Sequence, residues 1–307
     1  MRRQRGAALL LVVLLISLLS VLVMEFLREA RLELRSAGNL RDSLQGHALL
    51  RSGVAVGSAL LLADAEDNAV DHRGELWAGP IPPVPLGDGT LAVSVEDLDG
   101  KFPLGSLVDD RGRPVPTQVE AYRRLLDAAE LEEGDPAELV DALLAWIDAD
   151  DYGPYETSET FTIPNAPLEH LEDLGRIEGY TPAVLKSIQP YLDVRSDKAI
   201  NVNTAAVPVL LSLDDAMTRE GAEALYADLG NEPVERVSDL RSHAAFAEIK
   251  TFAALSQGLK VESSRFRFLM SASVPAASEN AVVRQAQAVL QRDRAKKTVE
   301  LVDWIEE

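Results

Sequence analysis

The chain has no cysteine among its 307 residues. Disulfide bonds and thiol chemistry are therefore excluded, and a hydrophobic core or bound metal ions must stabilise the fold. Only four histidines are present, and they are scattered: His47, His72, His170 and His243. The sequence contains no H-E-x-x-H, G-x-S-x-G, P-loop or G-x-G-x-x-G segment. We therefore expect no catalytic residue and no cofactor-binding residue, and the chain is not predicted to be an enzyme.

Basic residues are scarce outside the N-terminal region. The formal net charge is −20. Residues 1–51 carry eight arginines against four acidic residues, a net charge of +4, whereas the rest of the chain carries −24, nearly all of it between residues 52 and 264. Such an acidic surface repels phosphate, so we expect no nucleic-acid binding. The excess of carboxylates would keep a domain soluble, and it would also suit cation binding.

The sequence has one long hydrophobic run, residues 7–24, which contains no charge. As a helix it would be ~27 Å long, close to the thickness of the hydrocarbon core of a bilayer. Three arginines precede it and would hold the N-terminus in the cytoplasm. The only small-residue junction with basic residues behind it is Gly6-Ala7, before the run rather than after it. On this segment alone, a plain signal anchor and a span cleaved at Gly6-Ala7 are about equally favoured.

Proline is absent from residues 25–67, which follow this run. Apolar and small residues recur there at steps of three or four, as on one face of a helix. These are Phe26, Ala30, Leu34, Ala37, Leu40, Leu44 and Ala48. Together with residues 7–24 the segment predicts one helix of about 60 residues, ~90 Å long. Its four glycines would each weaken it by roughly 1 kcal/mol against alanine.

A helix that is half apolar and half amphipathic resembles the N-terminal element of type IV pilins and pseudopilins. In that family a prepilin peptidase cuts after the glycine of the basic leader, and the new amine can be methylated. The resemblance therefore implies cleavage between Gly6 and Ala7. Most members carry a glutamate at the fifth mature position, which meets the terminal amine of a neighbouring subunit; here that position is Leu11. This departure favours a subunit at the tip, although Leu11 alone is equally compatible with a simple anchor.

Strand patterns flank a long helical region. Residues 68–107 are rich in glycine and proline and alternate in polarity at 91–95. Helical patterns then follow at residues 119–129, 137–147, 182–189 and 205–213, and strand patterns return at 266–271, 282–290 and 298–304. This order predicts an α+β fold, in which a pilin-like long N-terminal helix packs on an antiparallel sheet and a large all-α domain is inserted in the sheet.

The predicted parts have the following bounds. They are a leader peptide (1–6), a transmembrane part (7–24) and an amphipathic part (25–67) of the helix, the first part of the head (68–107), the inserted α-helical domain (108–262) and the C-terminal strands of the head (263–307).

Four short segments, in the order of the family, resemble the K-type minor pseudopilin of type II secretion, the GspK family. One of them departs from the family pattern, with Ala145 where an aspartate is usual. The segments are residues 97–104 (DLDGKFPL), 143–150 (LLAWIDAD), 164–174 (PNAPLEHLEDL) and 200–205 (INVNTA).

The resemblance implies a minor pseudopilin at the tip of the periplasmic pseudopilus that supports protein secretion across the outer membrane. Before assembly it would be a single-pass inner-membrane protein with its head in the periplasm. The implied partners are the I- and J-type minor pseudopilins, the major pseudopilin, the prepilin peptidase and the inner-membrane assembly platform.

The best candidate for a metal site is an acidic segment of twelve residues. It contains Asp148, Asp150, Asp151, Glu156 and Glu159. Five carboxylates this close repel one another, and calcium, which takes six to eight oxygen ligands, would relieve the repulsion. Composition alone favours a solvated acidic loop. The family resemblance implies a structural calcium ion in this region.

Two further segments have structural interpretations. Asp97, Asp99 and Gly100 resemble the start of a calcium loop, but no glutamate follows at its end, so we expect a turn that leads out of the sheet. The segment 200–205 also resembles the opening of helix-hairpin-helix DNA-binding modules, but the glycine of the hairpin is missing. We expect Asn201 and Asn203 to bond loop backbone and Thr204 to cap the next helix.

Two alternatives to a filament subunit remain open at this point. One is a signal-anchored, calcium-stabilised periplasmic binding domain, and a less favoured one is a helix-hairpin-helix DNA-binding protein. The three tryptophans, Trp77, Trp146 and Trp304, are expected in the core rather than at a ligand.

Overall fold

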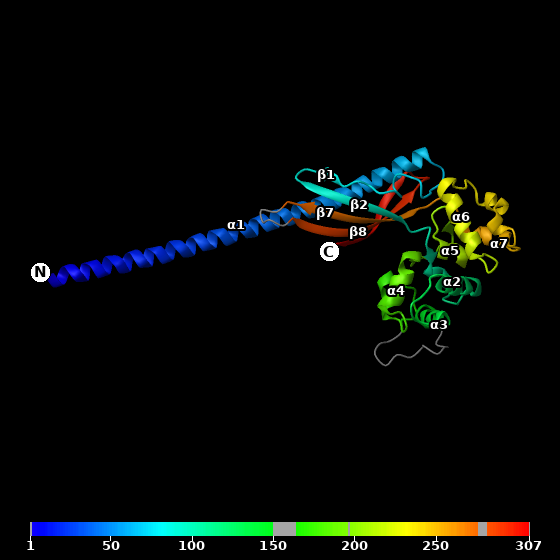
Figure 1. Ribbon diagram of the computed structural model, residues 1–307, viewed down its shortest axis with the longest axis horizontal. Helices are drawn as coiled ribbons and strands as arrows, with labels where there is room; N and C mark the ends of the chain where they lie inside the picture. The colour runs from blue at the N-terminus through cyan, green and yellow to red at the C-terminus, as the bar shows by residue number, and fades with distance from the viewer. Residues whose placement is uncertain (1, 150–163, 196, 276–280, 307) are drawn as a thin grey trace.

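One helix extends far beyond the rest of the molecule (Figure 1). The computed structural model describes residues 2–149, 164–195, 197–275 and 281–306. Helix α1 (Arg2–Asp67) has 66 residues, or ~99 Å at 1.5 Å per residue. Its N-terminal half is free, and its C-terminal half lies along a sheet (Figure 1). The single long helix that the sequence predicted is confirmed.

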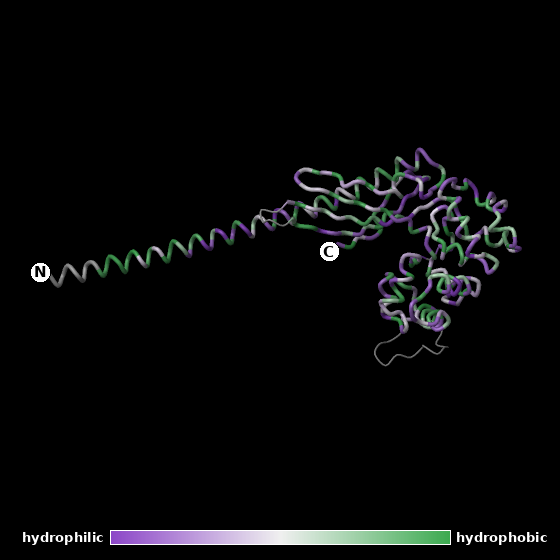
Figure 2. The backbone as a smooth tube through the Cα atoms, in the orientation of Figure 1, coloured by the Kyte–Doolittle hydropathy of each residue, from purple (hydrophilic) through white to green (hydrophobic). Residues whose placement is uncertain are grey.

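The free half of α1 has the composition of a membrane span. It contains an 18-residue window of mean hydropathy 2.8, none of which is buried. Figure 2 shows this apolar end of the helix in green, followed by a more hydrophilic stretch before the head. The helix is therefore long and apolar enough to cross a bilayer and still hold the head away from it.

The head is one antiparallel sheet of five strands in the order β1-β2-β7-β8-β9. The strands are β1 (Val84–Leu86), β2 (Gly89–Asp97), β7 (Arg265–Val274), β8 (Val282–Asp293) and β9 (Thr298–Glu306). Strand β2 pairs along its length with β7, which follows it by more than 160 residues in the chain. The predicted α+β fold, with a helical insertion between strands of one sheet, is thus confirmed.

The core of the head lies between α1 and one face of the sheet. Every second residue of β7, from Phe266 to Val274, is buried against the helix. The close approach depends on glycine: a Cβ at Gly53 would lie 2.6 Å from Met270 Sδ, and one at Gly57 would lie 2.6 Å from the Phe268 ring. The glycines that weaken α1 as an isolated helix therefore allow it to pack on the sheet.

The inserted region, here called the helical block, runs from Phe102 to Lys260. It contains six α-helices among the described residues, and its chain enters and leaves through two short parallel strand pairs, β3 with β4 and β5 with β6. The helices are α2 (Pro116–Ala128), α3 (Pro136–Ile147), α4 (Pro182–Ile188), α5 (Val207–Ser212), α6 (Arg219–Asn231) and α7 (Phe252–Leu255). The short strands are β3 (Phe102–Pro103), β4 (Leu192–Asp193), β5 (Ile200–Asn201) and β6 (Leu259–Lys260).

The helical block has a hydrophobic core of its own, separate from that of the head. At its centre Tyr122 of α2 is fully buried, and its hydroxyl lies 2.9 Å from that of Tyr180, which in turn donates to the Leu139 carbonyl. Helix α3 begins at a cap, where the Asp135 side chain accepts from the amide of Ala137 at 2.8 Å. The four predicted helices are confirmed, with ends that differ by up to three residues.

The tryptophans lie in or against the cores. Trp77 and Trp146 are buried, and Trp77 meets Phe266 edge-on with ring centroids 5.1 Å apart. Trp304 is partly buried on β9, where the guanidinium of Arg51 lies 4.4 Å from its ring centroid. The core interpretation of the tryptophans is confirmed.

Candidate functional site

The free segment of α1 is the first candidate site, because nothing in the described structure covers it. Leu11 is 66% exposed, and the other apolar side chains up to Met24 are exposed to a similar extent. Gly6 and Ala7 lie within the helix near its start. The cleavage between them is not tested by the fold and stays a prediction. The exposed apolar surface itself requires lipid or other helices as a partner.

The predicted calcium site is only partly described. Asp148 follows α3 directly, its amide donates to the Leu144 carbonyl at 2.9 Å, and the residue is 5% exposed. Asp150, Asp151, Glu156 and Glu159 lie outside the described residues. The ligand set at this end of α3 therefore stays a prediction.

A second acidic cluster, which sequence reasoning missed, lies where α1 ends. The carboxylates of Asp64, Asp71 and Glu75 come within 4.8 Å of one another. Two guanidinium groups already neutralise them: Arg292 pairs with Asp64 at 2.8 Å and with Asp71, and Arg294 pairs with Asp71 at 2.9 Å. These cations would repel a metal ion.

Burial, followed by the nearby charge of Asp64, raises the pKa of Glu75 to about 8. Glu75 therefore carries a proton at neutral pH, and the cluster of three acids and two arginines is electrically balanced without a metal. The indole of Trp77 donates to the same carboxyl group. We interpret the cluster as a structural anchor for the segment that leaves α1.

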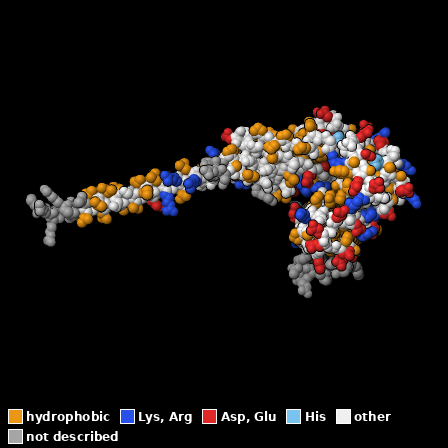
Figure 3. Space-filling view, in the orientation of Figure 1, with side chains coloured by type: hydrophobic (Ala, Val, Ile, Leu, Met, Phe, Trp, Pro, Cys, Tyr) orange, Lys and Arg blue, Asp and Glu red, His pale blue; other side chains and the backbone are white. Residues whose placement is uncertain are grey.

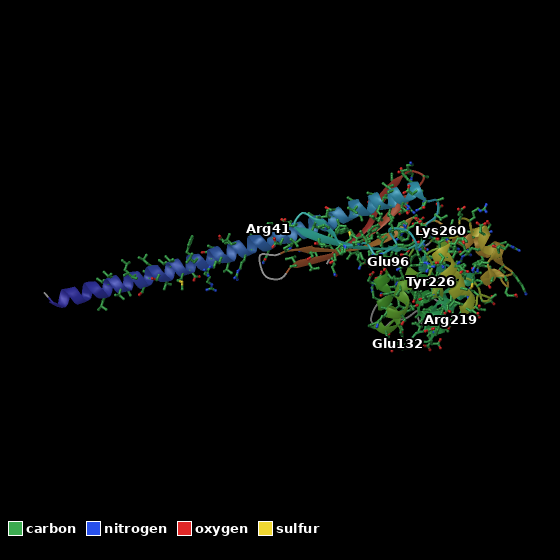
Figure 4. All side chains as sticks on the ribbon, turned by 45° about the horizontal axis from the view of Figure 1, so that its top comes forward. Arg41, Glu96, Glu132, Arg219, Tyr226 and Lys260 are labelled. Atoms are coloured by element: carbon green, nitrogen blue, oxygen red, sulfur yellow. The ribbon has the colours of Figure 1, made fainter. Side chains whose placement is uncertain are left out.

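The junction between head and helical block is a buried polar network. Asp97 accepts from the amide of Asp99 at 2.8 Å, which is the turn that the sequence predicted. The Asp99 carboxylate accepts from the Ser264 amide at 2.7 Å and from Lys260 Nζ at 2.8 Å, and Arg195 Nε lies 3.6 Å from it. Figure 4 labels Glu96, on β2, and Lys260, on β6, near this junction. These contacts show that charged groups, rather than a shared apolar core, connect the head to the helical block.

The segment 200–205 belongs to the same junction. The Asn201 amide group donates to the Asp71 carbonyl at 3.0 Å, and its oxygen accepts from the Asn203 amide at 3.1 Å. Asn203 exchanges two hydrogen bonds with the backbone of Val234, both at 3.0 Å. The prediction that these asparagines bond loop backbone is confirmed.

The predicted capping role of Thr204 is wrong. Helix α5 starts at Val207 after Ala206, and no side chain caps it. The Thr204 hydroxyl donates instead to the carboxylate of Asp97. The reason is that Asp97 is buried: burial, followed by the charge of Asp99, raises the pKa of Asp97 to about 6, and its ionised form needs hydrogen-bond donors.

The groups whose pKa burial raises lie away from the groove beside α2. A groove of about 770 Å³ lies between α2 and the segment around α7. The carboxyl and phenol groups whose pKa burial raises are Glu75, Asp97, Tyr122 and Tyr180, and none of these lines that groove. Within the described residues, the perturbed groups therefore belong to structural networks rather than to a pocket.

Comparison with known proteins agrees with this architecture. Two family models, both for protein K of the type II secretion system, match residues 100–197 and 200–262. Type II secretion system protein K from Aeromonas hydrophila is 30% identical over 302 residues, covering 89% of this chain and 90% of that protein. Protein K from Pseudomonas aeruginosa is 29% identical over 268 residues, covering 81% of this chain and 80% of that protein.

A solved structure has the same fold. The match is to a chain in the crystal structure of the GspK-GspI-GspJ complex from enterotoxigenic Escherichia coli, with a TM-score of 0.69 and 18% identity, covering 88% of this chain and 99% of that one. The two family models, the relatives matched over most of their length and the architecture of a long helix on a sheet with an inserted helical block all agree. The chain belongs to the type II secretion system protein K family and is a minor pseudopilin of type II secretion.

Proposed function

We propose that this chain caps the tip of the pseudopilus and assembles there with the I- and J-type minor pseudopilins and the major pseudopilin. One observation carries the proposal: a single exposed apolar helix supports a head that is broadened on one side by the helical block (Figure 1). Repeated helical packing requires subunits that fit above and below one another, and a block of this size obstructs one of those directions. The related E. coli chain was crystallised in a complex with GspI and GspJ.

The residue at position 11 supports the same location. A carboxylate within the lipid-facing helix would need a partner, because an unpaired charge in a bilayer is costly. Leu11 removes that need, and with it the link to the terminal amine of a subunit on that side. A subunit at the tip has no neighbour on that side, so a leucine in place of the glutamate costs it no contact.

The proposed location follows from the helix. The chain would be anchored in the inner membrane through residues 7–24 with its head in the periplasm, and the prepilin peptidase would cleave it between Gly6 and Ala7. The assembly platform would then extract it into the pseudopilus. The chain would act by packing against its partners.

A structural calcium ion is part of the proposal. Asp148 would supply one ligand at the end of α3, and Asp150, Asp151, Glu156 and Glu159 are the candidates for the others. We expect chelation to lower the melting temperature of the head, because a ligand that binds only the folded state stabilises it. Replacing both Asp150 and Asp151 by alanine should remove that sensitivity. Calorimetry without calcium binding up to millimolar concentration would return the loop to a solvated acidic segment.

Mass spectrometry of the mature N-terminus tests the pseudopilin processing. We expect the chain to begin at Ala7, with or without a methyl group, and a Gly6→Val variant to stay unprocessed. A mature chain that still begins at Met1, or after a site beyond Met24, would indicate a signal anchor outside a filament.

A further inference from the structure

The free part of α1 between the apolar run and the sheet carries its charges in two like-charged rows. Each row follows helical spacing, so its side chains project from one side of the helix. The basic row is Arg28, Arg31 and Arg35, and the acidic row is Glu25, Glu29 and Glu33. Figure 3 shows blue side chains gathered on this part of the helix, between the apolar end and the head.

This arrangement is unfavourable in an isolated helix. Like charges four residues apart repel, whereas a glutamate four residues before a lysine or arginine attracts. Here Arg31 and Arg35 are four apart, and each glutamate of the acidic row is four residues from the next; among the six, only Glu25 and Arg28, three apart, have an attractive spacing. All six side chains are exposed, and the first ion pair along the described part of α1 is Arg41 with Asp42 at 2.7 Å. The charges of the two rows are therefore left unpaired in the free chain.

The basic row points to the side on which the sheet lies. Steps of three or four residues lead from Arg35 through Asn39, Asp42 and Gly46, and then on to Gly53. A Cβ at Gly46 would lie 3.2 Å from Cδ of Arg284 on β8, and one at Gly53 would touch Met270 of β7. The basic row thus faces the space directly below the head, on its membrane side. The acidic row is turned away by about a third of a turn.

The basic row rises above the bilayer surface, and Arg35 stays above it even with its side chain extended toward the membrane. The headgroup layer adds about 5–8 Å to each side of the hydrocarbon core. Counted from Met24 at 1.5 Å per residue, Arg28 lies ~6 Å above the apolar run, but Arg31 lies ~10 Å and Arg35 ~16 Å above it. A protein surface at that height fits all three arginines better than lipid phosphates do.

We propose that the basic row, Arg28, Arg31 and Arg35, is a docking site for a neighbouring pilin-like subunit that presents a row of carboxylates below this head. The inference rests on the proposed function, because it needs a neighbour in the same assembly. Because the six exposed charges are segregated by sign, the two sides of the helix select different partners. The basic side attracts a carboxylate-bearing surface and repels the basic side of a second copy of this chain. The acidic row would repel the carboxylate-bearing partner and so fix the side on which it docks.

A zero-length carbodiimide crosslink tests the chemistry of the partner directly, because it joins only an amine to a carboxylate in contact. The full chain carrying Arg31→Lys is co-expressed with the other minor pseudopilins and purified in detergent. We expect an amide bond between residue 31 and an aspartate or glutamate of a neighbour, identified by mass spectrometry. The matched control is Ser36→Lys, an exposed position three residues after Glu33 on the acidic side. It should give no intermolecular product.

A charge reversal tests the energetic role. The triple variant Arg28→Glu, Arg31→Glu, Arg35→Glu should reduce the recovered hetero-complex at least tenfold. The control reverses three exposed lysines of the helical block, Lys186→Glu, Lys198→Glu and Lys250→Glu, and should leave the complex intact. Thermal unfolding of the head should be the same in both variants, since none of these side chains is buried.

Three results would overturn the inference or its basis. An intact complex from the triple variant, together with no crosslink from Arg31→Lys, would refute the docking site. Loss of binding to phosphatidylglycerol vesicles with an intact complex would assign the arginines to lipid. If the wild-type chain forms no complex with the other minor subunits, the proposed function itself is wrong.

Discussion

The head and the helical block are stabilised in different ways. The core of the head joins α1 to strands more than 200 residues later in the chain, as where Gly57 lies against the Phe268 ring. Among the described residues the block has the larger core, 36 buried residues against 13 in the head, and draws it from one segment of the chain. The block is therefore an independent hydrophobic unit, whereas the head exists only when both ends of the chain come together.

The two parts meet through polar groups and not through a common core. Asp99 and Arg195 are both almost fully buried there, and Arg195 also donates to the Lys101 carbonyl at 2.9 Å. Buried ion pairs fix geometry more reliably than they add stability. We infer that the junction sets the orientation of the block on the head, and that each core determines its own stability. The predictions below test this comparison, from the largest expected effect to the smallest.

The largest effect is expected from Arg292→Met in the head. Arg292 is 2% exposed, pairs with Asp64 and Asp71, and donates to the Ser263 carbonyl at 2.8 Å. Its loss leaves the Asp64 carboxylate without its cation and Asp71 with Arg294 alone, which should lower the free energy of unfolding by about 3–5 kcal/mol. Urea denaturation of the soluble head measures this. The control Lys296→Met removes a surface pair with Asp293 and should change stability by no more than about 0.5 kcal/mol.

The next prediction concerns the polar junction between the head and the helical block. Asp99→Asn removes the charge that meets Arg195 and Lys260 and should cost about 3 kcal/mol. Because each part has its own core, calorimetry of the variant should show two separate unfolding transitions. In the wild type the two transitions should lie closer together in temperature or merge into one. A single transition with an unchanged midpoint would contradict the role of the junction.

A pair of glycine substitutions probes the packing of α1. Gly57→Ala brings a Cβ within 2.6 Å of the Phe268 ring and should cost about 1–3 kcal/mol through overpacking. Gly38→Ala meets nothing within 4 Å and should stabilise the helix by up to about 1 kcal/mol. Opposite signs are expected, measured on the full chain in detergent. Equal effects would show that α1 does not lie against the sheet as described.

The last effect concerns pH and is the smallest per step, at no more than about 1.4 kcal/mol per pH unit for one proton. Because the pKa of Glu75 is raised to about 8 from its ordinary 4.5, the folded state holds a proton that the unfolded state has already released. The stability is therefore full below about pH 4.5 and falls as the pH rises toward 8. Asp97, with a pKa of about 6, contributes in the same direction at lower pH.

Glu75→Gln should remove that fall in the range from pH 6 to 8, where Asp97 has largely titrated. Denaturation followed by tryptophan fluorescence is a suitable measurement, since Trp77 donates to Glu75 directly. A variant whose stability falls with pH as steeply as the wild type would show that Glu75 is ionised in the folded protein.

The elements that the sequence predicted well are those with local signals. The absence of proline and the apolar spacing in residues 25–67 specify α1, and the alternation in residues 266–271 specifies β7. The short parallel pairs were missed because two residues, as in β5, contain no periodic pattern. Their pairing depends on where the block folds back on itself.

The polar junction could be predicted only in part. The turn at Asp97 has local causes, but its partners Thr204 and Ser263 lie more than 100 residues away. The role of Thr204 was mispredicted because a capping signal is read from neighbouring residues. The buried carboxylate that accepts its hydroxyl hydrogen bond is distant in the sequence. The cluster around Glu75 was missed for the same reason, since Arg292 is distant in sequence. The ligands proposed between Asp150 and Glu159 remain a prediction from family resemblance.

The central claim is that this chain is a tip subunit whose head joins other minor pseudopilin heads and does not polymerise alone. Light scattering of residues 25–307, a fragment that keeps the basic row, alone and mixed with the I- and J-type heads of the same system, tests it most directly. This fragment keeps the part of α1 that packs on the sheet, from Asp42 onward. We predict a monomer alone and a defined complex with one copy of this chain in the mixture. Homopolymers of this chain, or no complex with either partner head, would contradict the account.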